Sequence, residues 1–245
     1  TPLPVGTVTF LFTDIEGSTK LWEQQREAMR IALARHDALM RQNIAQHSGH
    51  VIKTRGDGFH AVFANATDAL EAALAAQMAL HTEPWPEAVF IRVRMALHTG
   101  TADFRDDDYY GPAVNRASRL AGLGHGGQTL LSDVTHSLCR DLNPPGVTFN
   151  PLGEHILKGL ERREAVFELR HPALPQTFPA LQPLLASIDE NTPSIAVLPF
   201  ADLSPEKDQE YFTDGLAEEL LNVLARGHGL RWASRRAALY FKVKN

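Results

Sequence analysis

Residues 8–19 read VTFLFTDIEGST, and this stretch decides the fold of the chain. Its first five residues form an apolar, β-branched run, which predicts a buried strand ending at Asp14. Residues 17–19 (GST) follow as a turn whose hydroxyl groups can cap a helix that begins near Lys20. A carboxylate therefore stands at the end of a buried strand, just before a helix start.

Strand and helix patterns extend outward from this stretch. Helices are predicted over residues 27–47, from Asn65 or Thr67 to about 81, and over 112–123. Strands are predicted over residues 51–52 and 59–63, which form a hairpin around RGDG at 55–58, and over 89–98, 128–131, 147–149 and 165–169. Thr99 and Gly100 are expected to end the strand over 89–98. This order predicts an α+β fold rather than strict βαβ repetition.

The chain is expected to divide after residue 170. Residues 171–193 carry five prolines in 23 residues and predict an extended linker that runs over the surface. Residues 194–245 follow as one strand, a helix over 211–226 and a second strand over 230–233, a partial α/β segment. A single unit of this size closes a core poorly, so it is expected to belong to a longer domain.

Composition narrows the functional classes. The chain has 24 Lys and Arg against 29 Asp and Glu, a formal charge of −5, and 44% hydrophobic residues. This balance argues against nucleic acid as a partner, because nucleic acids are bound through clustered cations. Cys139 is the single cysteine, so no internal disulfide forms and a cytoplasmic location is expected. No membrane span or signal peptide is predicted.

Several polar residues form a candidate site for a metal ion and a polyphosphate. Asp14 and Asp57 stand at strand ends, and carboxylates without nitrogen or sulfur ligands suit Mg²⁺ or Mn²⁺. Gly17, Ser18 and Thr19 at a helix start offer free N–H groups to phosphate. Asn115 and Arg119, four residues apart, share one face of a helix, and the Arg119 guanidinium can bind phosphoryl oxygens.

Each of these signals also has a simpler interpretation. Asp14 alone suits a helix cap, and Lys53 and Asp57 can pair across a solvated turn. Residues 106–108 (DDD) read equally as a hydrophilic loop, and Asn115 and Arg119 as a wetted helix face. Residues 122–127 (GLGHGG) satisfy GxGxxG but follow a predicted helix instead of a strand, so a helix-terminating loop is favoured over a dinucleotide site.

The three motifs together resemble one family. FTDIEGST at 12–19, KTRGDG at 53–58 and GPAVNRASRL at 111–120 occur in the order and spacing of class III nucleotidyl cyclase catalytic domains, over residues 5–170. The resemblance implies a ferredoxin-like sheet with helices on one face, in a catalytic domain spanning residues 1–170. It also implies a head-to-tail homodimer in which each cleft takes its metal ligands from one chain and its remaining residues from the other.

The resemblance assigns a role to each matching residue. Asp14, Asp57 and the carbonyl of Ile15 match the ligands of two Mg²⁺ or Mn²⁺ ions. Lys53 and Asp108 match the two purine-reading residues, and Asp108 is chosen from the acidic run because it lies seven residues before Asn115. Asn115 matches the residue that positions the ribose and Arg119 the one that stabilises the transition state. Lys158 matches a triphosphate-binding lysine.

These residues predict an adenylyl cyclase that makes cyclic AMP and pyrophosphate from ATP. Adenine presents an amine donor and a ring acceptor, which suit Asp108 and Lys53, whereas guanine reverses both and would leave a buried group unpaired. Three rivals stay open: a guanylyl cyclase, a non-catalytic nucleotide sensor that signals through residues 194–245, and a scaffold.

Residues 194–245 carry a second, shorter resemblance. IAVLPF at 195–200 and DGLAEEL at 214–220 resemble the opening of a TolB-like α/β domain. This resemblance implies a bacterial regulatory or interaction module that contacts a regulatory partner and carries no chemistry of its own.

Overall fold

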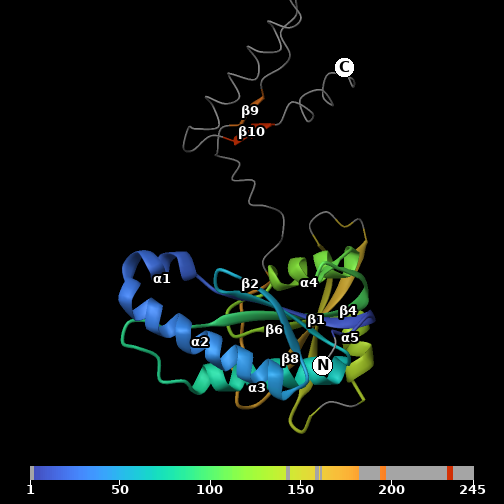
Figure 1. Ribbon diagram of the computed structural model, residues 1–245, viewed down its shortest axis with the longest axis horizontal. Coiled ribbons are helices and arrows are strands. Elements are labelled where there is room, and N and C mark those ends of the chain that lie inside the picture. The colour runs from blue at the N-terminus through green and yellow to red at the C-terminus, as the bar shows by residue number, and fades with distance from the viewer. Residues whose placement is uncertain are drawn as a thin grey trace, which may run out of the picture. The chain divides into compact units, whose positions relative to one another are not determined.

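The structure is a computed structural model that describes residues 3–141, 144–157, 160, 162–181, 194–196 and 231–233 of the 245-residue chain. The chain divides into two compact units, Thr1–Leu184 and Leu185–Asn245. Figure 1 labels the helices and strands.

An eight-stranded mixed sheet forms the centre of the first unit. Across it the order is β2-β3-β1-β4-β6-β8-β7, and β5 pairs with β4 alone. β4 and β6 run parallel, and the other pairs of this sheet are antiparallel. The strands are β1 (Gly6–Ile15), β2 (His50–Arg55), β3 (Gly58–Phe63), β4 (Val93–Arg105), β5 (Asp108–Tyr110), β6 (Thr129–Ser132), β7 (Thr148–Ile156) and β8 (Arg163–Arg170).

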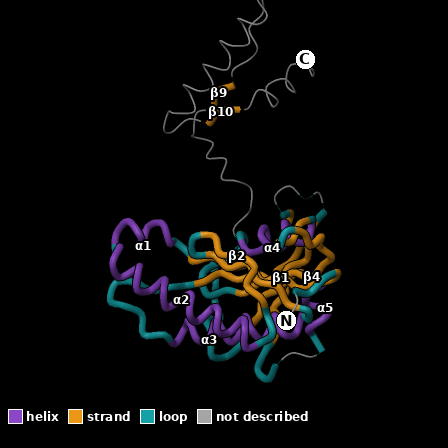
Figure 2. Tube along the Cα trace, in the orientation of Figure 1, coloured by secondary structure: helices purple, strands orange, loops and turns teal. Residues whose placement is uncertain are grey.

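The helices of the described residues pack on both faces of the sheet. They are α1 (Ser18–Gln24), α2 (Arg26–Gln46), α3 (Ala66–Thr82), α4 (Pro112–Ala121) and α5 (Asp133–Cys139). Figure 2 shows α2 and α3 along one side of the strands and α4 on the other. The predicted α+β class is confirmed, but the expectation of helices on one face is wrong for α4. None of these helices has the length and hydropathy of a membrane span.

The interior strand β1 is buried on both sides, which explains why apolar residues occupy both of its faces. Leu11 and Ile15 belong to the core beneath α2 and α3. Phe10 and Phe12 belong to a second core beneath α4. Because side chains alternate along a strand, Asp14 follows Phe10 and Phe12 onto the α4 face.

Several predicted element ends are wrong, among them the end of β4 and the start of α1. β4 does not end at Thr99 and Gly100 but continues to Arg105 and pairs with β5. Gly100 instead allows α4 to pack closely on β4, because a Cβ atom there would lie 2.8 Å from the Cβ of Ala113 in α4. The predicted hydroxyl cap is also absent: α1 already begins at Ser18, after Gly17 in a left-handed conformation, with no side-chain cap.

The chain beyond β8 continues to pack on the first unit. Leu174 is 7% exposed and belongs to the core beneath α3, and Leu181 packs against the core beneath α4. Residues 182–193 of the predicted linker lie outside the described residues.

In the second unit, β9 (Ser194–Ala196) and β10 (Arg231–Ala233) form a parallel pair. Parallel neighbours need a crossover connection, and the predicted order of strand, helix and strand would supply one. The predicted helix over 211–226 and the TolB-like motif at 214–220 lie outside the described residues.

His98 on β4 is expected to make folding sensitive to acid. It is 2% exposed and its Nδ1 atom lies 2.7 Å from the Ser132 hydroxyl. Burial, with a smaller contribution from Arg116, lowers the pKa of His98 to about 4. The unfolded chain therefore binds more protons between pH 6.5 and 4, so the free energy of unfolding falls by about 3 kcal/mol as the pH drops through that window.

Urea unfolding of the wild type and of His98→Gln at pH 7 and pH 4.5 measures this contribution. The variant should lose less stability between the two pH values, whatever its stability at pH 7. Equal losses in both proteins would contradict the assignment to His98.

Candidate active site

The two predicted metal-binding aspartates lie at the same end of β1. Asp14 is the penultimate residue of β1, and Asp57 lies in the tight turn between β2 and β3. Asp57 Oδ2 accepts a hydrogen bond from the backbone N–H of Ile15 at 3.3 Å. The turn comes this close because residue 58 is glycine: a Cβ atom on Gly58 would lie 2.7 Å from the carbonyl oxygen of Thr13. The β2–β3 hairpin thus brings the Asp57 carboxylate to the backbone of the residue that follows Asp14.

The donor atoms at this strand end fit a hard divalent cation. The side chains of Asp14 and Asp57 and the carbonyl of Ile15 offer only oxygen, which Mg²⁺ and Mn²⁺ prefer. Within the described part of the chain, no three His, Cys, Asp or Glu side chains gather into a metal cage. Mg²⁺ held by one or two carboxylates usually completes its shell with water and substrate phosphates. The site therefore suits an ion that binds together with a phosphate-bearing molecule.

Arg94 is a site residue that the sequence analysis missed. It stands opposite Asp14 in the pairing of β1 with β4, and its Nε donates to Asp14 Oδ2 at 2.8 Å. Its Nη2 atom also contacts Asp14 Oδ2. The side chains of Asp14 and Arg94 are 36% and 26% exposed, so water reaches the pair. An arginine within the otherwise apolar stretch VRMAL at 93–97 was the available signal, but the register that pairs it with Asp14 is not readable from sequence.

A cavity of about 250 Å³ opens on the α4 face of the sheet beside this pair. Asp14, Arg94, Arg55 and His60 line it from the sheet and its turns, and Ser118 lines it from α4. Two guanidinium groups thus share the cavity with one carboxylate. This local charge balance suits a polyphosphate, although the whole chain is acidic.

Lys53 and Asp108, the predicted purine readers, contact each other. Lys53 Nζ donates to Asp108 Oδ2 at 2.5 Å, linking β2 to β5 across the α4 face. The backbone N–H of Tyr109 donates to Asp108 Oδ1 at 2.8 Å. Partial burial opposes ionisation of Asp108, but these hydrogen bonds and the Lys53 charge outweigh it and hold the pKa of Asp108 below its usual value. The alternative in which Lys53 pairs with Asp57 is not what the structure has.

His60 is a second missed residue beside this pair. It stands opposite Lys53 in the β2–β3 hairpin and packs on the Phe12 ring, with centroids 4.0 Å apart. Its Nδ1 atom is buried and has no hydrogen-bond partner among the described residues. Burial, followed by the charges of Lys53 and Arg55, lowers the pKa of His60 to about 4. A neutral imidazole therefore lines the cavity next to the predicted base readers.

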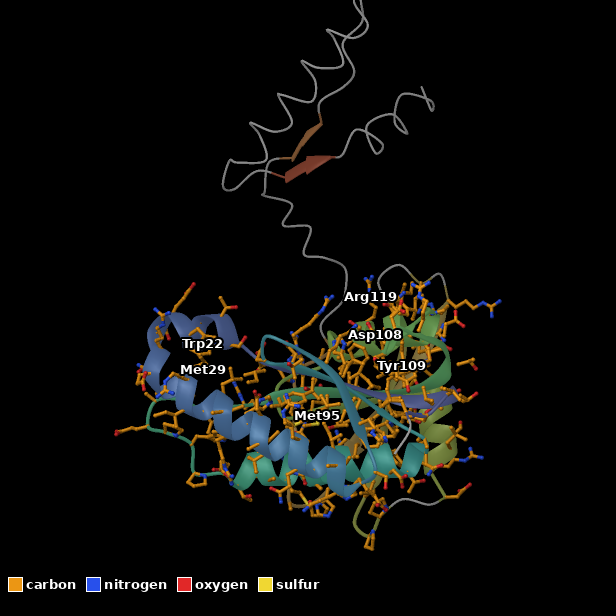
Figure 3. All side chains as sticks on the ribbon, in the orientation of Figure 1. Trp22, Met29, Met95, Asp108, Tyr109 and Arg119 are labelled. Atoms are coloured by element: carbon orange, nitrogen blue, oxygen red, sulfur yellow. The ribbon has the colours of Figure 1, made fainter. Side chains whose placement is uncertain are left out.

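The remaining predicted residues are less closely grouped. Asn115 is exposed on α4 and Arg119 is half-buried there, and within the described residues neither side chain makes a hydrogen bond or ion pair. Figure 3 shows Arg119 and Asp108 on the α4 side of the molecule, away from Trp22 on α1. Gly17, Ser18 and Thr19 open α1 beside the strand end. Lys158 lies outside the described residues.

Known proteins match most of the chain. The family described as "Adenylate and Guanylate cyclase catalytic domain" matches residues 2–170. The uncharacterized protein Rv0891c of Mycobacterium tuberculosis is 41% identical over 181 residues, covering 73% of this chain and 61% of that protein. The adenylate cyclase of Neurospora crassa is 33% identical over 229 residues, covering 71% of this chain and 10% of the fungal protein. This chain therefore spans less than two thirds of the length of either relative.

A solved structure gives the same result for the fold. The adenylate cyclase of Trypanosoma brucei in its monomeric state superposes with a TM-score of 0.66 at 26% identity. The match covers 75% of this chain and 97% of the trypanosome chain. The shared fold thus extends over nearly the whole solved domain.

The ion pair of Arg94 with Asp14 predicts that Arg94 weakens cation binding in the absence of nucleotide. Arg94→Met is expected to tighten Mn²⁺ binding by about fivefold, the factor that a partly exposed ion pair is worth. Electron paramagnetic resonance of free Mn²⁺ measures this affinity. Arg105→Met is the matched control, since Arg105 pairs with Asp106 in the exposed β4–β5 turn. Equal affinities in the two variants would show that Arg94 does not restrain Asp14.

Proposed function

Because the chain belongs to the adenylate and guanylate cyclase catalytic domain family, we propose that it is an adenylyl cyclase converting ATP to 3′,5′-cyclic AMP and pyrophosphate. The observation that carries the choice of ATP is the contact of Lys53 with Asp108, one cationic donor and one anionic acceptor held side by side. The adenylate cyclase names of relatives at modest identity support the same choice.

The reaction is a displacement at the α-phosphorus of ATP. The ribose O3′ forms a bond to phosphorus, the bond to the β-phosphate oxygen breaks, and the hydroxyl proton passes to water. Asp14, Asp57 and the Ile15 carbonyl would hold Mg²⁺ or Mn²⁺, two ions in the proposed site, which acidify the hydroxyl and neutralise the polyphosphate when bound. No side-chain base is required, and the lowered pKa of His60, about 4, makes its imidazole a weak base.

Cationic side chains are proposed to stabilise the charge that grows on the phosphates. Arg94 lines the cavity, and a phosphate oxygen that replaces the Asp14 carboxylate would gain two donors from one guanidinium. Arg119 would act at the α-phosphoryl oxygens and Lys158 at the triphosphate, as their motifs indicate. Ser18 and Thr19 begin α1 near the same strand end, where their N–H groups are available to phosphate.

Two copies of the chain are proposed to share each cleft. Asn115 and Arg119 face away from the apolar core on α4, and their side chains contact no described polar group. In a homodimer with twofold symmetry, the same surface on both copies would build two equivalent sites. The metal-binding strand end of one chain would then meet the α4 residues of its partner.

Mixing two inactive variants tests the shared cleft. Asp57→Ala and Arg119→Ala should each be inactive, yet an equal mixture should recover about a quarter of the wild-type activity. Random exchange makes half of the dimers hybrid, and each hybrid has one intact site of two. Release of pyrophosphate from ATP and Mn²⁺ measures the activity.

A mixture of Asp14→Ala with Asp57→Ala is the control, since both variants damage the same side of the cleft and should stay inactive together. If the first mixture also stays inactive although both variants fold and dimerise, the shared cleft is wrong. If the wild type binds ATP but releases no pyrophosphate, the chain is a nucleotide sensor instead.

Asp108→Asn is expected to shift base preference toward GTP. The amide can donate to the guanine O6, whereas the carboxylate can only accept, so the ratio of kcat/KM for ATP to that for GTP should fall about 10- to 100-fold. Steady-state kinetics with both nucleotides under one metal measure this ratio. Asp107→Asn is the matched control, because Asp107 lies in the exposed turn next to Asp108. A larger change in the Asp107 variant would show that the wrong acid was assigned to the base.

A further inference from the structure

The GLGHGG loop at residues 122–127 has a structural partner at the metal-binding end of β1. That partner is Glu16, the residue directly after Ile15. Glu16 Oε1 accepts a hydrogen bond from the N–H of Gly126 at 3.1 Å, and Oε2 lies 3.2 Å from Nη2 of Arg92. The backbone N–H of Glu16 donates to the carbonyl of Arg92 at 2.9 Å. Glu16 therefore fastens the end of β1 to this loop.

The contact leaves no room for a larger residue in the loop. A Cβ atom on Gly126 would lie 2.6 Å from the Cβ of Arg92 and 2.9 Å from the Cβ of Glu16. The next residue, Gly127, has a φ of +90° and donates its N–H to the carbonyl of Val93. The glycines are thus explained by close packing against β4 and Glu16, and not by a bound dinucleotide.

A second segment also contacts this loop. Residues 171–181, the C-terminal strap, follow the part of the chain that matches the family and pack on the first unit. Leu174 anchors the strap in the core, and Phe178 lies 3.8 Å from the position of a Cβ atom on Gly127. The Gln176 side chain donates to the carbonyls of His171 and Leu174 and so fixes the strap's own turn.

His125 joins the strap to Glu16. Its Nε2 atom lies 3.0 Å from the carbonyl oxygen of Ala180, and its Nδ1 atom lies 3.8 Å from Glu16 Oε1. The ring is 12% exposed, and its backbone N–H donates to the Gln128 side chain at 3.1 Å. One imidazole therefore lies within hydrogen-bond distance of the strap and next to the carboxylate that follows the metal ligands.

We propose that the C-terminal strap positions the metal-binding end of β1 through His125 and Glu16. Glu16 and His125 are positioning residues, since neither is assigned to the cation or the nucleotide. Any partner or neighbouring segment that draws the strap away from His125 would weaken cation binding at Asp14 and Asp57. The inference rests on the proposed function for the identity of those ligands.

The coupling has a reciprocal consequence that can be measured without catalysis. If the strap favours cation binding, cation binding must favour the docked strap by the same factor. In the full chain, Mn²⁺ with a non-hydrolysable ATP analogue should therefore slow amide hydrogen exchange over residues 172–181. Replacing His125 or Glu16 should remove that protection.

The test compares the wild type with His125→Phe and Glu16→Gln in the full chain. Each variant is expected to bind Mn²⁺ about fivefold more weakly and to lose the protection of the strap. His155→Phe is the matched control. His155 lines a second cavity together with Phe178 and Ala180 of the strap, but its ring lies within hydrogen-bond distance of the Leu152 carbonyl and not of the strap. This control should keep the affinity and the protection of the wild type.

The outcomes separate this inference from the proposed function. Wild type that binds no Mn²⁺ overturns the proposed function. If the wild type binds Mn²⁺ and both Glu16→Gln and His125→Phe behave like the control His155→Phe, only the role of the strap is overturned. If His125→Phe fails to fold, the milder Glu16→Gln decides the question alone.

Discussion

The site depends on the register of β1 between β3 and β4. That register sets Phe12 opposite His60 on one side and Asp14 opposite Arg94 on the other. A slip by one residue would turn Asp14 toward the core beneath α2 and α3, where an unpaired carboxylate is costly. Apolar side chains pack on both faces of β1, so burial fixes the register without help from the charged pairs.

Charged side chains around this strand are paired with one another in a way that leaves the pairs exchangeable. Three ion pairs lie here, and the side chains of each are at least partly exposed to water: Asp14 with Arg94, Asp108 with Lys53, and Glu16 with Arg92. Such pairs contribute little to stability, so a cation or a phosphate can replace one member at small cost. Deeply buried pairs would resist that exchange, because a single member left behind would be strongly destabilised. Partial exposure therefore suits a site that must change partners.

Much of the fold could be predicted from local sequence patterns, but features set by contacts between distant segments could not. The hairpin around Asp57 and the helices α2, α3 and α4 follow from turn residues and periodicity. Arg94 and His60 were missed because their importance comes from strands paired across the sheet. The side of the sheet taken by α4 is likewise set by packing against Phe10 and Phe12. The roles of Asn115 and Arg119 remain predictions, because they concern a second copy of the chain.

The strap also shows why a sequence family and a packed unit need not end together. The family match stops at residue 170, but Leu174 fills part of the core beneath α3 and Leu181 packs against the other core. Proline-rich sequence predicted an extended segment there, and extended chain can still bury the few apolar residues it carries. Because such burial fixes the backbone between its anchors, the Ala180 carbonyl is held in place against His125. A segment outside the family's sequence pattern can thus help to hold the residues of the family's site in position.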